Sequence, residues 1–133
     1  MMTQAEMAEP DQKKPKRLYA IMYPDCLIDG GGPLTMQDVM MLSRENTVGF
    51  ITPAEVKIPK HLTTIIDFSI MAADTMDASA FSQVLIKIAE NFEADEYYLV
   101  ARGFRFVQAA TLGGFILIFP HSLLAELHRR RLL

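Results

Sequence analysis

The chain has 133 residues, 50% of them hydrophobic and 22% charged, with a formal net charge of −3. This length suits one domain with a real core, and the composition excludes a disordered chain as well as a membrane protein. The single cysteine, Cys26, excludes an internal disulfide framework and indicates a reducing compartment, so we expect a cytoplasmic protein. We predict a disordered polar tail over residues 1–16 and a single α+β domain over residues 17–133.

The charged residues are unevenly distributed. Residues 1–17 carry four basic and three acidic groups, residues 18–120 carry six and twelve, and residues 121–133 carry three and one. The acidic body repels a phosphate backbone, so we do not expect nucleic acid as the main partner. The longest apolar run, Gly113–Leu127, is interrupted by proline, histidine and glutamate, so we expect no membrane insertion.

The first predicted strand is Leu18–Tyr23, a short apolar run that ends at a proline. The next stretch, Pro24–Pro33, is rich in Gly, Pro and Asp and contains three consecutive glycines. A P-loop needs Lys followed by Ser or Thr after its last glycine, and the dinucleotide fingerprint needs spaced glycines that open a helix directly after a strand. Neither pattern is present, so we interpret Pro24–Pro33 as a flexible connector and predict no cofactor.

A helix is predicted to begin at Thr35, because Thr35 and Asp38 have the spacing of a capping box. Asn46 and Gly49 indicate the end of this helix. Two short strands are predicted to follow, Val48–Ile51 and Glu55–Ile58, separated by a Thr-Pro pair.

The segment Leu62–Met71 fits two different periods. Alternate residues give an apolar face for a strand, whereas a spacing of 3.6 residues gives one for a helix. Because β-branched side chains are frequent here, we favour a strand and keep the helix as the alternative.

The clearest pattern in the chain predicts an amphipathic helix that begins near Asp77 or Ser79, either of which can cap it. Full burial of its apolar stripe is worth on the order of 10 kcal/mol before the opposing conformational entropy, so the helix must pack on another element. The side chains of the stripe are Phe81, Val84, Leu85, Ile88, Ala89 and Phe92.

The segment Tyr97–Val107 is predicted to be one long or bulged strand with Gly103 as its irregular point. Thr111–Gly114 has the chemistry of a tight turn, and Phe115–Phe119 is typical of a central strand that is buried on both faces. We therefore expect a hairpin. A final helix, Ser122–Arg131, places three arginines at its C-terminal end.

The predicted order of elements is β-α-β-β-α-β-β-α. This order indicates an α+β fold, with an antiparallel or mixed sheet of about five strands and three helices on one face. Over residues 35–131 it is similar to the small acidic chaperones of bacterial type III secretion, a resemblance that implies three helices with a five-stranded sheet. The strand at Leu18–Tyr23 has no counterpart in that class.

A second resemblance concerns the run from Arg102 to Val107. Arg102, Gly103, Phe104, Phe106 and Val107 match the first RNA-contact motif of the RRM family, whereas Arg105 stands where a small residue is expected. The resemblance implies strand aromatics that stack on bases. The other interpretation is ordinary strand packing, with Arg102 and Arg105 facing the acidic Glu90–Glu96 turn. A nucleic-acid-associated protein is therefore the alternative function, using Arg102, Phe104, Arg105, Phe106 and the Arg129–Arg131 helix end.

The residues with catalytic or metal-binding chemistry form no recognisable set. Asp25 and Asp29 flank Cys26 and raise the pKa of its thiol, which disfavours a nucleophile. His121 and His128 lie about 10 Å apart along the predicted helix, too far to share one ion. We therefore predict no enzyme, no metal and no cofactor, and a small enzyme with a dispersed site stays as a further hypothesis.

Nine methionines and several amphipathic helices distinguish this composition. Methionine side chains are flexible and polarisable, which suits adaptable apolar surfaces. We therefore predict a non-enzymatic protein-interaction module, such as an adaptor, a chaperone or a small subunit of a larger assembly, that binds a protein partner or a second copy of itself as an oligomer. The predicted binding residues are Met36, Met40, Met41, Leu124, Leu127, Arg129 and Arg130.

Overall fold

The computed structural model describes residues 17–53, 56–72 and 76–131. The predicted tail over residues 1–16 and Glu55 of the second predicted strand lie outside these residues. The described chain forms a five-stranded parallel sheet in the order β4-β3-β2-β5-β6. The strands are β2 (Arg17–Met22), β3 (Thr47–Thr52), β4 (Phe68–Met71), β5 (Glu96–Val100) and β6 (Ile116–Ile118).

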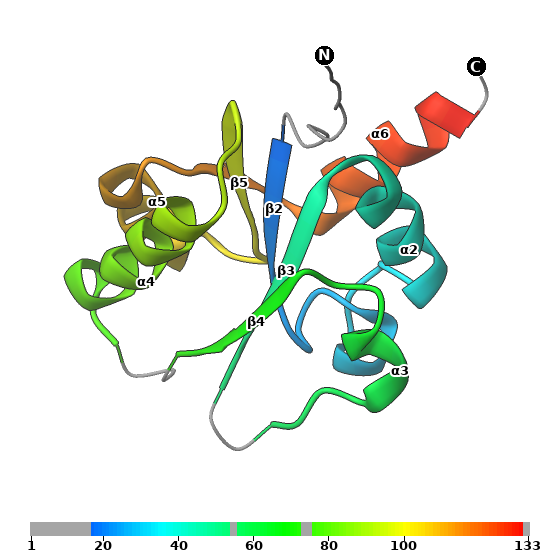
Figure 1. Cartoon of the computed structure of the whole chain (residues 1–133), viewed down its shortest axis with the longest axis horizontal. Coiled ribbons are helices and arrows are strands. Elements are labelled where there is room, and N and C mark those ends of the chain that lie inside the picture. The colour runs from blue at the N-terminus through cyan, green and yellow to red at the C-terminus, as the bar shows by residue number, and fades with distance from the viewer. Residues whose placement is uncertain (1–16, 54–55, 73–75, 132–133) are drawn as a thin grey trace, which may run out of the picture.

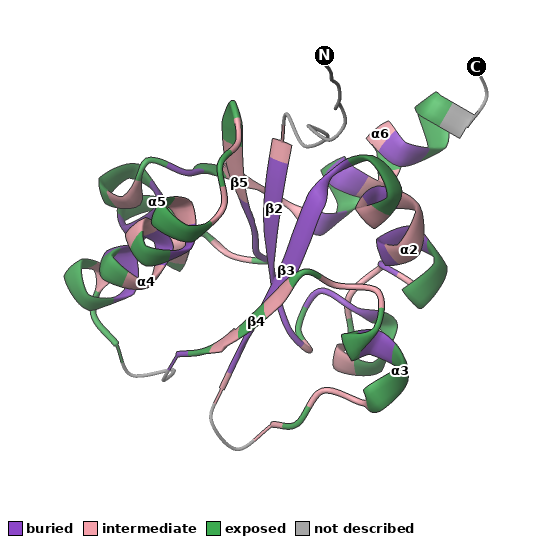
Figure 2. Ribbon diagram, in the orientation of Figure 1, coloured by how far each residue is buried: buried purple, intermediate pink, exposed green. Residues whose placement is uncertain are grey.

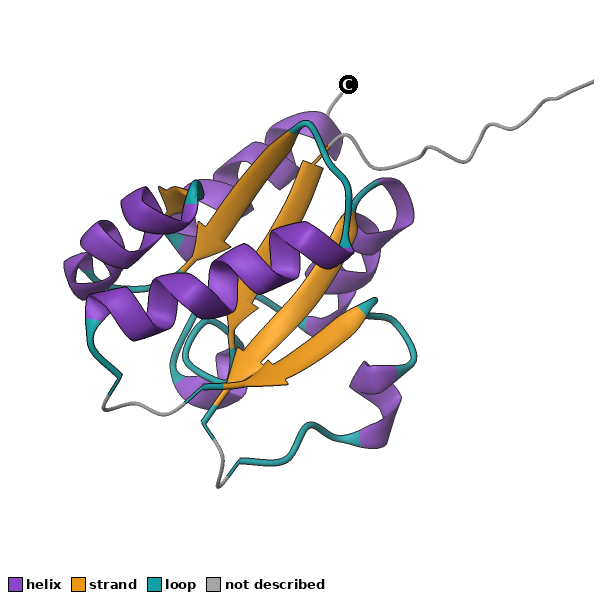
Figure 3. Cartoon of the chain, turned by 60° about the vertical axis from the view of Figure 1, so that its left-hand side comes forward, coloured by secondary structure: helices purple, strands orange, loops and turns teal. Residues whose placement is uncertain are grey.

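Helices cover both faces of this sheet (Figure 1). One face carries α2, α3 and α6, and the other carries α4 and α5, which pack against each other. Figure 3 shows α4 lying across its face of the sheet. The helices are α2 (Met36–Glu45), α3 (Lys60–Thr63), α4 (Ala78–Asn91), α5 (Val107–Gly113) and α6 (Pro120–Arg131), with short 3-10 turns at Ile28–Gly30 and Phe104–Phe106.

The central strands β2 and β3 are buried on both faces. Every residue of β3 is buried, as is every residue of β2 except Arg17 (Figure 2). Parallel sheets with helices on both faces require this pattern, because neither face meets water. The continuous apolar run at Leu18–Tyr23 was the sequence signal for it, and the prediction of a buried strand there is confirmed.

The predicted α+β class with an antiparallel or mixed sheet and three helices is wrong. All pairings in the described sheet are parallel, and five α-helices accompany it, so the fold is α/β. The resemblance to type III secretion chaperones therefore does not extend to the fold. Parallel neighbours need crossover connections, and the short helices α3 and α5 supply two of them. Neither helix was predicted as such, although a helix was the alternative for the segment that begins at Leu62.

The predicted hairpin is wrong for the same reason. The chain leaves the sheet after Val100, makes a 3-10 turn and forms α5, so only the first part of Tyr97–Val107 is a strand. Gly114 has a φ of 79° and ends α5, with its N–H bonded to the carbonyls of Ala110 and Thr111. The glycines of the expected turn therefore lie at the end of a helix, where a left-handed conformation favours glycine.

Three further strand predictions need correction. The expected central strand Phe115–Phe119 is the edge strand β6, and Ile116 is 53% exposed. Residues 56–58 of the expected strand Glu55–Ile58 form no strand. The segment Leu62–Met71 divides into the end of α3 and, after a loop, β4, so each alternative holds for part of it.

The helix boundaries that depend on capping are confirmed. Thr35 and Asp38 form a reciprocal capping box at the start of α2, which ends at Asn46. Asp77 caps α4 by accepting a hydrogen bond from the N–H of Ala80. The apolar stripe of α4 faces the sheet and α5, with Phe81, Leu85 and Ile88 buried and the other members partly buried. In the described part of the chain, no helix has the length and apolar character needed to cross a membrane.

Gly49→Ala is expected to destabilise the fold by about 1–3 kcal/mol. Gly49 pairs with Phe68 of β4, and a Cβ at Gly49 would overlap the Phe68 ring, which packs on Phe92. Urea unfolding measures the loss. In a Phe68→Ala background the same substitution must cost less, because the ring is gone, and an equal cost in both backgrounds would contradict this account.

Candidate functional site

The carboxyl ends of β2 and β5 define the position in this fold where a site is most expected. From β2 the chain proceeds to β3 on one side, whereas β5 pairs on the other side, so the strand order reverses between β2 and β5. In open parallel sheets, ligands bind in the crevice outside the carboxyl ends of the strands at such a reversal. The segments that follow β2, β4 and β5 meet at this edge.

The loop after β2 closes over the end of β5. The Cys26 thiol donates to the carbonyl oxygen of Val100, with 3.4 Å between sulfur and oxygen. From the other direction, Arg102 donates from Nη1 to the carbonyl oxygens of Asp25 at 3.4 Å and Gly30 at 3.3 Å. This loop therefore occupies part of the strand reversal itself, held by groups from both strand ends.

The glycines of this loop are needed for close backbone packing. A Cβ at Gly30 would overlap the carbonyl of Pro24, and a Cβ at Gly32 would overlap the carbonyl of Cys26. Gly31 has a φ of 91°, which favours glycine. The N–H groups of Gly30 and Gly32 donate to the carbonyl of Leu27. The loop is therefore folded on itself, in place of the flexible connector expected from the sequence.

Cys26 lies fully buried within this loop. Burial raises the pKa of its thiol to about 12, and the negative charge of Asp25 adds to the shift. The direction expected from the acidic neighbours is confirmed, although burial is the larger cause. A thiol that keeps its proton at neutral pH is a poor nucleophile and a poor metal ligand.

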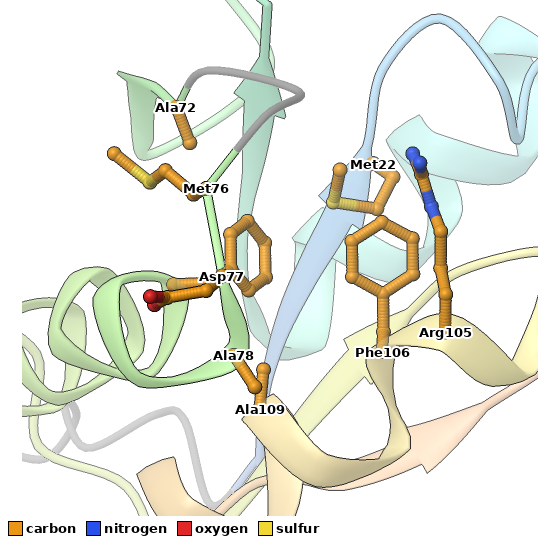
Figure 4. Close-up of a pocket in the computed structure, with 9 residues that line it drawn as sticks. Met22, Ala72, Met76, Asp77, Ala78, Arg105, Phe106 and Ala109 are labelled. Atoms are coloured by element: carbon orange, nitrogen blue, oxygen red, sulfur yellow. The ribbon is translucent and has the colours of Figure 1, made fainter.

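A pocket lies beside this loop, on the α4 and α5 side of the carboxyl edge (Figure 4). It has a volume of about 120 Å³. The Phe106 ring packs on Phe81 with 5.3 Å between centroids, and the Arg105 guanidinium lies 4.6 Å from the Phe106 centroid. The lining residues are Met22, Ala72, Met76, Asp77, Ala78, Phe81, Arg105, Phe106 and Ala109.

Exposed apolar side chains gather around the same edge. Eight large hydrophobic side chains are exposed in the described part of the chain, and six belong to segments at the carboxyl ends of strands. The other two, Leu112 and Ile116, lie where α5 ends and β6 begins, at the opposite edge. We call the six, together with Arg105, the carboxyl-edge surface: Ile28, Met36, Met71, Met76, Phe104, Val107 and Arg105.

The structure does not bring the predicted protein-binding residues together: five of them lie in three separate places, and two lie in none of these. Met41, Leu127 and Arg130 line a groove between α2 and α6, and Leu124 lines a second groove with His128. Met36 lies at the carboxyl edge with Ile28. Two further predicted residues line none of these grooves: Met40 is half-buried and Arg129 is exposed. Arg130 pairs with Glu126 at 3.4 Å, and the Arg131 side chain lies outside the described residues.

The residues of the predicted RNA-contact motif do not form a strand platform. Phe104–Phe106 is a 3-10 turn, in which Phe104 contacts Phe119 edge-on and Phe106 faces Phe81. Arg102 and Arg105 do not face the Glu90–Glu96 turn, because that turn precedes β5 and both arginines follow it, at opposite edges of the sheet. The strand aromatics implied by the RRM resemblance are therefore not formed by Phe104 and Phe106.

Metal-binding residues are dispersed in the described part of the chain. Residues 17–53, 56–72 and 76–131 contain no group of three or more His, Cys, Asp or Glu side chains placed to hold an ion. Asp67 has a structural role, since its carboxylate accepts a hydrogen bond from the N–H of Val48 at 2.9 Å.

Sequence reasoning missed the pocket and most of its lining. Met22 ends the first strand, Phe81 begins the α4 stripe, and Ala109 lies in a helix that was not predicted. One signal in the sequence could have indicated it, namely the continuous apolar run of β2. A strand that is buried on both faces indicates a parallel sheet, and the residues that follow the strands of a parallel sheet lie at one edge.

Comparisons with known proteins give a distant structural similarity only. No family model matches the chain, and no curated protein matches its sequence. Two crystal structures of the C-terminal domain of a Pyrococcus furiosus hydrogenase are similar, with TM-scores of 0.48 and 0.45 and sequence identities of 15% and 13%. The alignments cover 84% and 77% of this chain and 94% and 89% of that domain. Similarity of this degree says nothing about the activity of the chain.

The free energy of unfolding is expected to fall as the pH rises above about 9, in part because of Cys26. The unfolded thiol ionises near its ordinary pKa of 9.0, whereas the folded thiol has a pKa of about 12. Between these two pKa values the folded state binds more protons than the unfolded state. The stability that the protonated thiol contributes is therefore fully present below pH 9. As the pH rises further, the free energy of unfolding falls by up to ~1.4 kcal/mol per pH unit.

Urea unfolding of the wild type and of Cys26→Ala over the same alkaline range isolates the thiol. Burial also raises the pKa values of Tyr23 and Tyr98, and both tyrosines are retained in the two proteins. The variant must lose stability less steeply with pH than the wild type. Equal slopes would show that the thiol titrates alike in both states.

Gly32→Ala is expected to cost about 2 kcal/mol or more, because backbone atoms of Cys26 occupy the space of the new methyl group. The matched control is Gly103→Ala in the facing loop, where no atom lies within 4 Å of the added Cβ. Thermal unfolding of both variants gives the comparison. A Gly32→Ala protein as stable as the Gly103→Ala protein would contradict the packed loop.

Proposed function

We propose that the protein is a non-enzymatic protein-interaction module that binds another protein at its carboxyl-edge surface. The observation that carries this proposal is the gathering of exposed Met and Phe side chains at that edge, with Phe104 at 76% and Met71 at 66% exposure. Exposed apolar side chains that follow several strands at one edge of a small domain support a binding role for that edge. An adaptor, a chaperone or a small subunit of a larger assembly fits this role.

The chemistry of the surface suggests the chemistry of the partner. Methionine side chains adapt to differently shaped apolar groups, and aromatic and arginine side chains are frequent at the energetic centres of interfaces. In the described residues, Arg105 has no carboxylate within ion-pair distance, and its guanidinium is held on the Phe106 ring. We therefore infer a partner segment with apolar side chains and a nearby carboxylate.

The non-enzymatic part of the proposal rests on the state of Cys26. This thiol lies at the strand reversal, where catalytic groups are frequent in α/β folds, yet burial keeps it protonated and it bonds to Val100. A single buried cysteine also supports work in the cytoplasm, which we propose as the location.

The double variant Met71→Ser/Phe104→Ser tests the proposal. Both side chains are largely exposed, so the fold is expected to remain stable. The matched control is Leu112→Ser/Ile116→Ser, which removes two exposed side chains at the opposite edge. Each protein is immobilised, incubated with lysate of the source organism, and the captured proteins are quantified by mass spectrometry.

We expect a defined partner that the wild type and the control retain and that the Met71→Ser/Phe104→Ser variant retains at least about tenfold less. Prior nuclease treatment is expected to leave the capture unchanged. Capture that is independent of the edge variant would overturn the proposed surface. Capture that is lost with nuclease would favour the nucleic-acid alternative through Arg102 and Arg105.

A further inference from the structure

The pocket at the carboxyl edge has an apolar floor. Met22, Phe81 and Ala109 come from β2, α4 and α5, and all three are buried. Phe106 forms one wall through its contact with Phe81. Figure 4 shows Met22, Phe106 and Ala109 coming from separate elements. Because the sheet, α4 and α5 position them, the pocket is formed without any partner.

The volume of the pocket limits what it can hold. A dry apolar cavity of about 150 Å³ in a protein core binds benzene. The 120 Å³ found here is close to that size. An aromatic ring or a short branched alkyl group therefore matches the space, whereas a nucleotide does not.

Arg105 is the positively charged residue among the described residues that line this pocket. The Arg105 guanidinium lies against the Phe106 ring, which limits its freedom before any ligand binds. Among the described lining residues the other charged one is Asp77, whose carboxylate caps α4 by accepting a hydrogen bond from the N–H of Ala80 at 2.8 Å. In Figure 4 the Asp77 carboxylate points away from Arg105. On the side of the rim formed by Arg105, a ligand therefore meets positive charge.

We propose that this pocket binds a small free carboxylate that carries an apolar group of about the size of a benzene ring. The apolar group lies among Met22, Phe81 and Ala109, and the carboxylate pairs with Arg105. Its position outside the carboxyl ends of parallel strands, beside the strand reversal, is where open α/β sheets hold ligands. Arg105 and Met76 also belong to the carboxyl-edge surface, so a protein partner there would compete with the small carboxylate, whereas the experiment below measures the small ligand without any partner.

Methyl NMR of the full chain, labelled at the methionine methyl groups, tests the proposal with benzoate as the probe. Met22 and Met76 both line the pocket, so their methyl signals report directly on it. We expect saturable shifts of both signals with a dissociation constant on the order of 1 mM, as suits a ligand of so few atoms. Benzyl alcohol, which lacks the charge, is expected to bind about tenfold more weakly.

The variant Arg105→Gln separates the charge from the apolar floor. It must weaken benzoate about tenfold and remove the preference over benzyl alcohol, because only the carboxylate interacts with the guanidinium. The matched control is Arg44→Gln, which removes an exposed arginine of α2 on the opposite face of the sheet and must leave benzoate binding unchanged. Ala109→Leu fills the floor and must abolish the shift of Met22 by both probes.

Three results would overturn the proposal. The first is no saturable shift of the Met22 signal up to about 20 mM benzoate, well above the expected dissociation constant. The second is an equal affinity of the wild type and Arg105→Gln for benzoate. The third is an equal loss in Arg44→Gln, which would indicate a nonspecific response to net charge.

Discussion

The pairing of β2 with a parallel neighbour on each side is the constraint on which the rest of the structure depends. Because β3 and β5 both run in the direction of β2, each connection must return from the carboxyl edge to the amino edge of the sheet. Helices make these returns: α2 leads from β2 to β3 and α4 leads from β4 to β5. Every segment that follows a strand therefore begins at one edge, and side chains far apart in sequence meet there.

The loop after β2 occupies part of this edge. Its glycines let the backbone fold on itself, and Cys26 and Arg102 bond it to the end of β5 and the loop beyond. A loop packed so closely leaves little room for a phosphate at the strand reversal itself. The available space lies to one side, over Met22, where the 3-10 turn at Phe104–Phe106 provides a wall and a cation.

The α2 and α6 helices form the other surface of interest. Their grooves contain several of the residues expected from the sequence to bind a partner, but Leu127 is buried there and Arg130 is paired with Glu126. Exposed apolar area, which drives association, is concentrated instead at the carboxyl edge. Met36 belongs both to the residues predicted to bind a partner and to the carboxyl-edge surface, since it begins α2 at that edge.

The sequence by itself determined the features whose causes are local: the capping box at Thr35, the Asp77 cap with its amphipathic helix, the buried first strand, and the direction of the Cys26 pKa shift. Only the tertiary structure decided strand direction, the edge position of β6, and the helical path of the chain from Phe104 to Gly113. Short apolar runs fit a strand and a helical turn alike, and the choice between them depends on which distant segments bury them. The pocket could not be predicted from the sequence, because its walls are brought together by the parallel pairing and not by spacing along the chain.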